Sequence, residues 1–480
     1  MFRLFGLGHY LPYALLPIVV HVVIVVLVWL LLLRAGIRPW IAAALGAVLA
    51  VMGVGVENTL WDFQIGFMGP VAFGLAAVLL MPGAAGRLRR DGLVLLLVLA
   101  GLMTSGQGLV MLVVVAVHAL LTRGVRFAGL VAGGGLATYL IWYAAVGHAG
   151  TASDSITASS LAGVPRIVLI GLAHVWDGLS GLPGAGAVVL VAALVALVRA
   201  DGRPGWARRT HLATSCLAGA VTLFVLTGLT RNQSVAQASA SRYAYIAACL
   251  TAPAVAVALQ WLLGDQPVRR RVTQGVALAV TAGLLLTGFA TVYRFRVERV
   301  QTIGDLHQRL AAAAALASSG QRLLNDKPSP DFNPQATASL LVAAQRAGRG
   351  ITLHPTAAEL ADAASFLQVR VGLSPIGAPA ATAITLRGAV LTGVSADGCR
   401  EGRAVQRGNY LEVPTAGPME LHLRTSAVKL LTRLLRDGRR SDTATWHIRP
   451  GADEYVAATV PAGDVLEIVF DQPVTFELCP

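Results

Sequence analysis

The segment Glu57–Phe67 gathers carboxylates, amides and aromatic rings next to long apolar stretches. Glu57 and Asp62 could each act as a general base or hold a divalent metal ion. Asn58 and Gln64 could bind sugar hydroxyls, and Trp61 could stack on a pyranose face. The alternative is an interfacial belt, in which Trp61 lies at the level of the lipid headgroups and Glu57 pairs with an arginine. Because polar groups at a membrane boundary are costly, the segment is a candidate functional site.

A second cluster, Ser241–Tyr245, follows a polar stretch that begins at Arg231. Arg242, supported by Arg231, could clamp a phosphate or pyrophosphate through two parallel hydrogen bonds. For a lone arginine near the end of a helix, the commoner alternative is snorkelling to lipid phosphate. Tyr243 would lie beside Arg242 in the same site.

Four histidines have weaker signals. His21 and His118 lie within apolar spans, where an interhelical hydrogen bond is a better expectation than a proton relay. His174 and Asp177 are three positions apart, so they could form an acid–base pair on one face of a helix. His9 lies just before the first span and could join the cavity proposed around Arg242.

Fourteen arginines predict the membrane topology and so the side on which these residues lie. The arginines cluster at the ends of apolar spans, in every second connection along the chain. Short cytoplasmic loops accumulate Lys and Arg, so the clusters mark the inside of a polytopic membrane protein. Hydrophobic residues make up 55% of the chain and charged residues 13%, which agrees. The net charge of +13 is explained by these clusters, and no nucleic-acid partner is expected. The clusters are Arg34/Arg38, Arg87/Arg89/Arg90, Arg123/Arg126, Arg199/Arg203/Arg208/Arg209 and Arg269–Arg271.

The hydropathy pattern predicts about ten transmembrane helices, since about 20 apolar residues cross a hydrocarbon core. Gly92–Leu121 has arginines at both ends and a break at Thr104–Gly108, so it should form a hairpin. The tip of that hairpin, with Ser105 and Gln107, would line a cavity. The other predicted spans are Leu11–Leu33, Trp40–Val56, Ile65–Met81, Phe127–Val146, Pro183–Val198, His211–Leu229, Tyr243–Leu263 and Val272–Val292.

Two segments do not fit a plain bundle. Pro165–Gly181 is apolar but carries Arg166, and the arginine pattern allows only one crossing before Arg199, so we expect an interfacial or re-entrant helix. At the other end, Met1–Tyr10 would lie outside without a preceding helix. We therefore expect that an upstream span is missing.

After the transmembrane domain, residues 1–293, the character of the sequence changes. Residues 294–380 should form a helical connector with short helices at Ala336–Ala347 and Ala357–Leu367. Residues 381–480 alternate with a period near two between Gly and Pro turns, which predicts a small β-sandwich. A disulfide between Cys399 and Cys479 would fasten the last strand, as in an oxidising, extracytoplasmic compartment.

The motifs ENTLWDFQIGF at 57–67, SGQG at 105–108 and SRYAY at 241–245, with Gly398-Cys399 and the late Cys479, resemble those of a family of bacterial polytopic proteins. That family is similar to the GT-C class of integral-membrane glycosyltransferases. The resemblance implies a protein of the bacterial plasma membrane that takes a sugar from a polyprenyl-phosphate donor on the outer face. The acceptor would be an envelope glycan, lipid or protein, and no cofactor is implied beyond a possible divalent metal.

The chain departs from that class at its first outer loop, where the class places a catalytic acid. No acidic residue precedes the Leu11 span, so Asp62 and Glu57, one loop later, are substitutes by location only. Enzymatic activity therefore depends on an N-terminal element ahead of Met1, or on these substitutes. The alternatives are a non-catalytic envelope scaffold and a lipid-linked-sugar transporter or flippase, although no internal repeat supports a transporter.

Overall fold

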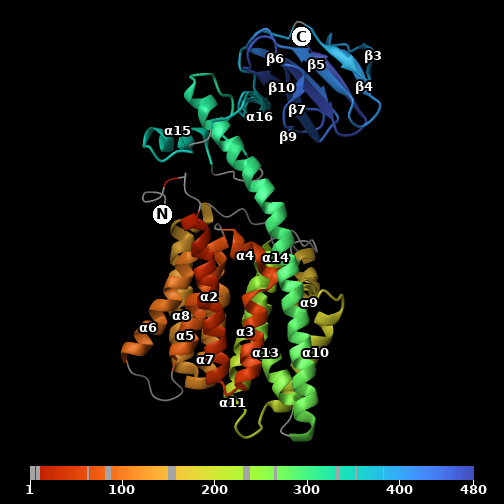
Figure 1. Ribbon diagram of the computed structural model, residues 1–480. Helices are drawn as coiled ribbons and strands as arrows, with labels where there is room; N and C mark the ends of the chain where they lie inside the picture. The colour runs from red at the N-terminus through yellow and green to blue at the C-terminus, as the bar shows by residue number, and fades with distance from the viewer. Residues whose placement is uncertain are drawn as a thin grey trace. The chain divides into compact units, whose positions relative to one another are not determined.

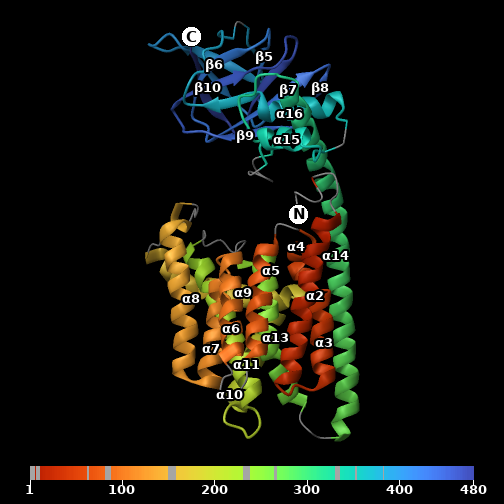
Figure 2. The same cartoon turned by 90° about the vertical axis from the view of Figure 1, so that its left-hand side faces the viewer.

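The computed structural model describes residues 6, 11–61, 64–81, 88–149, 158–230, 238–263, 267–329, 336–351, 354–381 and 383–479. Its contacts divide the chain into a helical unit, Leu11–Val297, and a second unit that contains Glu298–Pro480. The sequence predicted the domain boundary after Tyr293 and not after Val297, and a single helix runs through both positions. Figures 1 and 2 show the two units from perpendicular directions.

The helical unit is a bundle around one large apolar core. Its side chains are Leu, Val, Ile, Ala and Met on nearly every face, as expected for helices that pack against each other and against lipid. The helices are α2 (Leu11–Arg34), α3 (Pro39–Ala50), α4 (Val56–Leu60), α5 (Ile65–Leu80), α6 (Leu88–Thr104), α7 (Gly108–Arg123), α8 (Val125–Ala145), α9 (Ala158–Ser180), α10 (Ala185–Ala200), α11 (Ala207–Thr230), α13 (Ser241–Leu263) and α14 (Pro267–Ser318).

The bundle has the composition of a multi-pass membrane protein. Within the described residues, six helices are long and apolar enough to cross a membrane, and α3 with the segment Gly53–Leu60 makes a seventh if the bent pair counts as one span. Three shorter apolar helices, α5, α7 and α10, accompany them. The count of ten crossings stays a prediction, because several of the helices concerned are shorter than a full hydrocarbon core.

The second span is not the straight helix that Trp40–Val56 predicted. α3 ends at Ala50, and after a 3-10 turn at Gly53–Gly55 the chain continues at an angle of 43° as α4. Glycines allow close packing here: a Cβ on Gly53 would lie 2.4 Å from Thr291, and one on Gly55 would lie 2.7 Å from Tyr245. The break follows from these two contacts, which only a residue without a side chain can make.

One end of the bundle, here called the basic end, collects arginines Arg34, Arg123 and Arg209. The guanidinium of Arg34 donates to the carbonyl of Met81 (2.8 Å), and that of Arg209 donates to the carbonyl of Gly36 (2.9 Å). These bonds satisfy carbonyls that have no partner at helix ends. Arg34, Arg123 and Arg209, which belong to three of the arginine clusters expected on one side, therefore lie at the same end of the bundle.

α6 and α7 form the hairpin that the break at Thr104–Gly108 predicted. Arg123, in the last turn of α7, makes two hydrogen bonds of 3.0 and 3.1 Å to Asp91, in the first turn of α6. The start of α6 and the end of α7 therefore lie together at the basic end. The tip at Ser105–Gln107 lies at the opposite end, here called the polar end, where the hydroxyl of Ser105 donates to the carbonyl of Gly66 (2.6 Å).

α9 contains the segment for which an interfacial or re-entrant helix was expected. It packs against α10, α11 and α13, and the indole of Trp176 is buried and donates to the hydroxyl of Thr251 (3.1 Å). The prediction of an interfacial helix is therefore wrong. Ile167 lies against Gly228, in the last turn of α11, and Gly181 lies against Thr287. Both contacts are near the polar end. Leu161–Ser180 is also one of the six helices long and apolar enough to cross a membrane, so the re-entrant path stays a prediction.

α14 is a single helix of 52 residues, where a span and a separate connecting helix were expected. It is followed in the second unit by α15 (Ala338–Arg346) and by α16 (Ala357–Leu367), which has the predicted bounds. A capping box begins α16: the amide of Glu359 donates to the hydroxyl of Thr356, and the Glu359 carboxylate accepts from the amide of Thr356.

The described residues after α16 form two six-stranded sheets. Sheet A has the order β1-β10-β6-β12-β4-β3, and sheet B has the order β2-β5-β11-β7-β8 with β9 beside β7. All of the strand pairs are antiparallel. The strands are β1 (Val369–Gly372), β2 (Thr385–Arg387), β3 (Ala389–Val394), β4 (Arg400–Ala404), β5 (Tyr410–Pro414), β6 (Met419–Thr425), β7 (Lys429–Arg436), β8 (Arg439–Arg440), β9 (Ala444–His447), β10 (Asp453–Ala458), β11 (Val465–Phe470) and β12 (Val474–Cys479).

The inner faces of the two sheets share one apolar core. Phe470 of β11 in sheet B stacks on Phe476 of β12 in sheet A, with ring centroids 5.2 Å apart. Inward residues alternate with outward polar ones, as in β6, where Leu421 and Leu423 are buried and His422 and Arg424 are half-buried. This alternation is the pattern of a two-layer sandwich.

Candidate functional site

Four segments that are distant in sequence meet at the polar end. The amide of Glu57, in α4, donates to the hydroxyl of Ser241 at the start of α13 (3.3 Å). Phe67, in α5, meets Tyr243 edge to face, with ring centroids 6.1 Å apart. The hairpin tip joins them through the bond from Ser105 to Gly66 described above. The two motifs and the hairpin tip that the sequence singled out therefore form one cluster.

Asn58 and Gln64 are the most unusual side chains in this cluster. Asn58 is fully buried and Gln64 is 2% exposed. Both polar atoms of the Asn58 amide, and the Oε1 of Gln64, have no hydrogen-bond partner in the structure. A buried polar atom without a partner costs about 1–3 kcal/mol, so such atoms are rare. Their presence in one short segment indicates a place where water or a polar ligand completes the hydrogen bonds.

The same four segments carry charged side chains of both signs. Glu57 precedes Asn58 directly and is half-buried. The guanidinium of Arg242 lies over the ring of Tyr243, with its central carbon 5.1 Å from the ring centroid. Tyr243 is buried, so it holds the arginine at the start of α13. The cluster thus combines a carboxylate, a guanidinium and free amide atoms.

The remaining predicted site residues have different positions. Trp61 and Gln107 are half-buried near the cluster, and the hydroxyl of Ser105 also accepts from the amide of Gln107 (3.2 Å). Asp62 and Arg231 lie outside the described residues, as does His9. Asp177 accepts from the amide of Gly186 (2.7 Å) at the start of α10, which gives it a capping role rather than the expected pairing with His174.

His21 and His118 both make interhelical hydrogen bonds, as the sequence predicted. The Nδ1 of His21 lies 2.9 Å from the hydroxyl of Tyr245, and its Nε2 lies 3.1 Å from the carbonyl of Ala50. His118 lies 3.4 Å from the hydroxyl of Ser215. In the sequence, Tyr245 is only one residue of the motif at 241–245; its full burial and its bond to His21 show its role.

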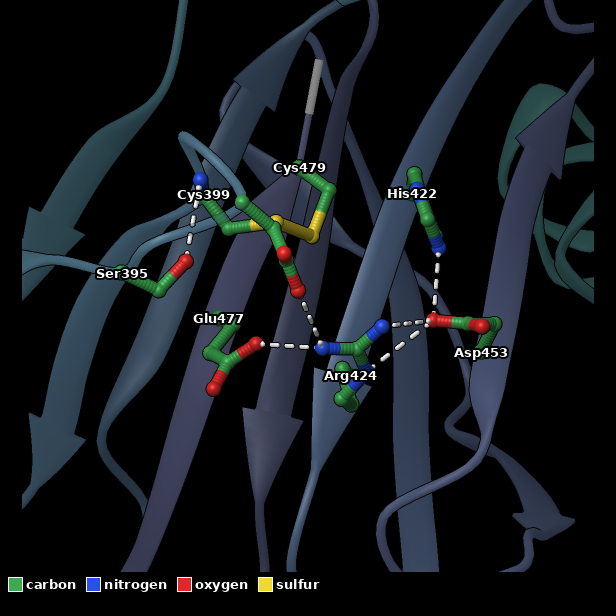
Figure 3. A network of polar contacts seen from close by, with 8 residues as sticks. Ser395, Cys399, His422, Arg424, Asp453, Glu477 and Cys479 are labelled. Atoms are coloured by element: carbon green, nitrogen blue, oxygen red, sulfur yellow. Dashed lines mark hydrogen bonds and ion pairs between the residues drawn. A yellow bond between two sulfur atoms is a disulfide. The ribbon is translucent and has the colours of Figure 1, made fainter.

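The second unit holds the disulfide between Cys399 and Cys479, which joins the end of β12 to the turn before β4. These sulfurs and Glu477 lie close together, but the two cysteines are oxidised and offer no thiolate to a metal. Glu477 instead pairs with Arg424, as Figure 3 shows.

The bundle and the sandwich together define a multi-pass membrane protein with a C-terminal antiparallel β-sheet region. The chain matches no protein-family model, no curated protein and no solved structure.

Proposed function

We propose that this protein is an integral-membrane glycosyltransferase, which moves a sugar from a polyprenyl-phosphate donor to a cell-envelope acceptor. The observation that carries the proposal is the pair of buried amides, Asn58 and Gln64, with unsatisfied polar atoms. A sugar supplies several hydroxyl groups, each of which both donates and accepts. A buried site that hydrogen-bonds substrate hydroxyls leaves such atoms unsatisfied when it is empty.

The reaction needs no more than the groups at the polar end. The acceptor hydroxyl oxygen attacks the anomeric carbon, and the bond between that carbon and the phosphate oxygen breaks. The hydroxyl proton goes to a carboxylate. The first candidate is Glu57, whose position the structure describes, and the second is Asp62. The negative charge grows on the departing polyprenyl phosphate, where Arg242 (with Arg231) would stabilise it. Trp61, Ser105 and Gln107 would line the sugar site.

The proposed membrane is the bacterial plasma membrane, with the polar end and the C-terminal sandwich on the outer face. The arginines of the opposite end support this orientation, since basic residues favour the cytoplasmic side. The disulfide between Cys399 and Cys479 supports an oxidising location for the sandwich.

The test is transfer of radiolabelled sugar from a panel of polyprenyl-phosphate hexoses and pentoses, using membranes that contain the full chain. Wild-type membranes should label an envelope acceptor, and Arg242→Gln and Glu57→Gln should each lower transfer by about 100-fold or more. Arg126→Gln is the matched control, because Arg126 is exposed at the start of α8 and should not affect transfer. Full activity in both site variants would exclude the assignment, and donor flipping without transfer would favour a flippase.

A further inference from the structure

The outer face of sheet A carries a row of chemically active side chains on adjacent strands. Tyr455 of β10 is opposite His422 of β6, and His422 is opposite Cys479 of β12, which is bonded to Cys399. Directly paired residues point to the same face of a sheet. Asp453, Arg424 and Glu477 form the next row on the same three strands. Polar and aromatic groups are therefore collected on one face, away from the core.

A pocket of about 610 Å³ opens on this face. One wall is the segment Pro375–Ala381, and Gly398 and Arg400 lie on the other side. Glu420 fixes the first wall, because its carboxylate accepts from the amides of Ile376, Gly377 and Ala378 at 3.1–3.3 Å. His422, Tyr455 and Cys479 also line the pocket. The pocket is thus built on rigid strands and on a wall held by three hydrogen bonds.

Hydrogen bonds orient the aromatic pair on the sheet. The ring of His422 stacks on that of Tyr455, with centroids 4.7 Å apart and planes 12° apart. The Nε2 of His422 lies 3.1 Å from the carboxylate of Asp453, which also accepts from the guanidinium of Arg424 (Figure 3). Arg424 in turn pairs with Glu477 at 2.9 Å. This network sets the orientation of His422 and, through the stack, of Tyr455.

The two sides of Tyr455 have different neighbours. His422 covers the face toward β6, whereas the residue opposite Tyr455 on β1 is Gly372. No atom lies within 4 Å of the position that a Cβ on Gly372 would occupy. The position above Gly372 is therefore open on the side of Tyr455 that faces β1, next to the pocket that Tyr455 lines.

We infer that this pocket binds an oligosaccharide. An aromatic face offers a surface for the C–H groups of a sugar ring, and the nearby guanidinium, imidazole and carboxylates can bond its hydroxyls. A wholly apolar ligand fits less well, because Arg400 and His422 are among the residues that line the pocket. That the oligosaccharide is the acceptor glycan rests on the proposed function, whereas binding itself does not.

The test measures binding of the full-length protein in detergent to a panel of purified bacterial cell-envelope oligosaccharides. Wild type should bind at least one of them, and Tyr455→Ala and Gly372→Leu should each weaken it about tenfold or more, which is about 1.4 kcal/mol. Gly372→Ala is the matched control: a methyl group fits the open space, and binding should change less than about threefold. No binding to any member of the panel, or equal binding by the wild type, Tyr455→Ala and Gly372→Leu, would overturn the inference.

The two proposals fail separately. Gly372→Leu should leave transfer to a small soluble acceptor unchanged, because the bundle is untouched. Arg242→Gln should lose transfer and keep oligosaccharide binding. Loss of transfer in Arg242→Gln with no oligosaccharide binding by any variant would retain the enzyme and reject the pocket.

Discussion

The hydroxyl of Tyr245 lies 2.9 Å from the Nδ1 of His21, although 224 positions separate the two residues. The second nitrogen of His21 contacts the carbonyl of Ala50, which is left free where α3 breaks. One buried imidazole therefore joins α2, α13 and the broken end of α3. α4, which carries Glu57 and Asn58, contacts both α2 and α13.

Removing the Tyr245 hydroxyl should loosen this junction without leaving a cavity. Tyr245→Phe is expected to lower the free energy of unfolding by about 1 kcal/mol, a typical value for an interhelical hydrogen bond in a membrane. Thermal unfolding in detergent measures the change. Tyr139→Phe, on the more exposed helix α8, is the control and should unfold as the wild type does. Equal losses in both variants would mean that the bond to His21 contributes nothing specific.

Asn58 should separate stability from activity. In Asn58→Leu, an apolar side chain of similar size replaces a buried amide without partners, so stability should be unchanged or rise by about 1 kcal/mol. Sugar transfer should fall by about 100-fold, since the amide contact is lost. Unfolding and transfer are measured on the same preparation. A variant that is less stable and still active would show that Asn58 is structural.

Glu467 is the buried centre of an ion-pair network in the sandwich. It is fully buried in β11 and pairs with Arg433 and Arg440, which flank the ring of Tyr410. Glu467→Gln should destabilise the protein by about 2 kcal/mol or more, because two arginines lose the charge of their buried acceptor. The control is Glu412→Gln, whose partner Arg387 is exposed, and it should cost less than about 1 kcal/mol. Chemical denaturation followed by tryptophan fluorescence compares the two.

Asp453 should make the sandwich acid-sensitive. Its hydrogen bonds from His422, and then from Arg424, lower the pKa of the Asp453 carboxyl below its ordinary value of 3.8. A pKa that is lower in the folded state adds stability above the unfolded-state pKa, and this is lost as pH falls through the folded value. The stability difference between wild type and Asp453→Asn should therefore be constant at neutral pH and shrink below about pH 4. A difference that is the same at pH 7 and pH 3 would contradict the ionised pairing.

The Cys399–Cys479 disulfide closes a stretch of 80 positions. Loop entropy predicts that its removal costs about 4.5 kcal/mol. Cys399→Ser should therefore lower the unfolding temperature of the sandwich markedly, and the same result should follow treatment of the wild type with dithiothreitol. The buried thiols Cys216 and Cys249 provide the control, because Cys216→Ser leaves the sandwich unchanged. Reductant without effect would show that the strands hold this edge by themselves.

The sequence predicts the helices best where a single signal decides. The α6–α7 hairpin follows from arginines at both ends and a polar break at Thr104–Gly108, and α16 has the bounds Ala357–Leu367 that were predicted for it. The alternation with a period near two after residue 381 predicted the β-sandwich, as β5 and β6 show.

Tertiary packing decides the features that the sequence did not predict. β7 has the sequence KLLTRLLR, whose leucine spacing suits a helix, yet its pairing with β11 and β9 makes it a strand. The break after α3 depends on what Gly53 and Gly55 contact, namely Thr291 and Tyr245, which local sequence does not reveal. The convergence of Glu57, Ser105 and Ser241 could be expected from topology, but the lack of partners for Asn58 could not.

The row Tyr455, His422 and Cys479 is assembled from strands that are not neighbours in sequence. β6 must be placed between β10 and β12, and both of these strands follow it in the chain. Such long-range pairings form slowly, because loop closure must precede the contacts that stabilise it. The pocket should therefore be among the last parts of the sandwich to acquire its shape during folding, and oligosaccharide binding would report a completed fold.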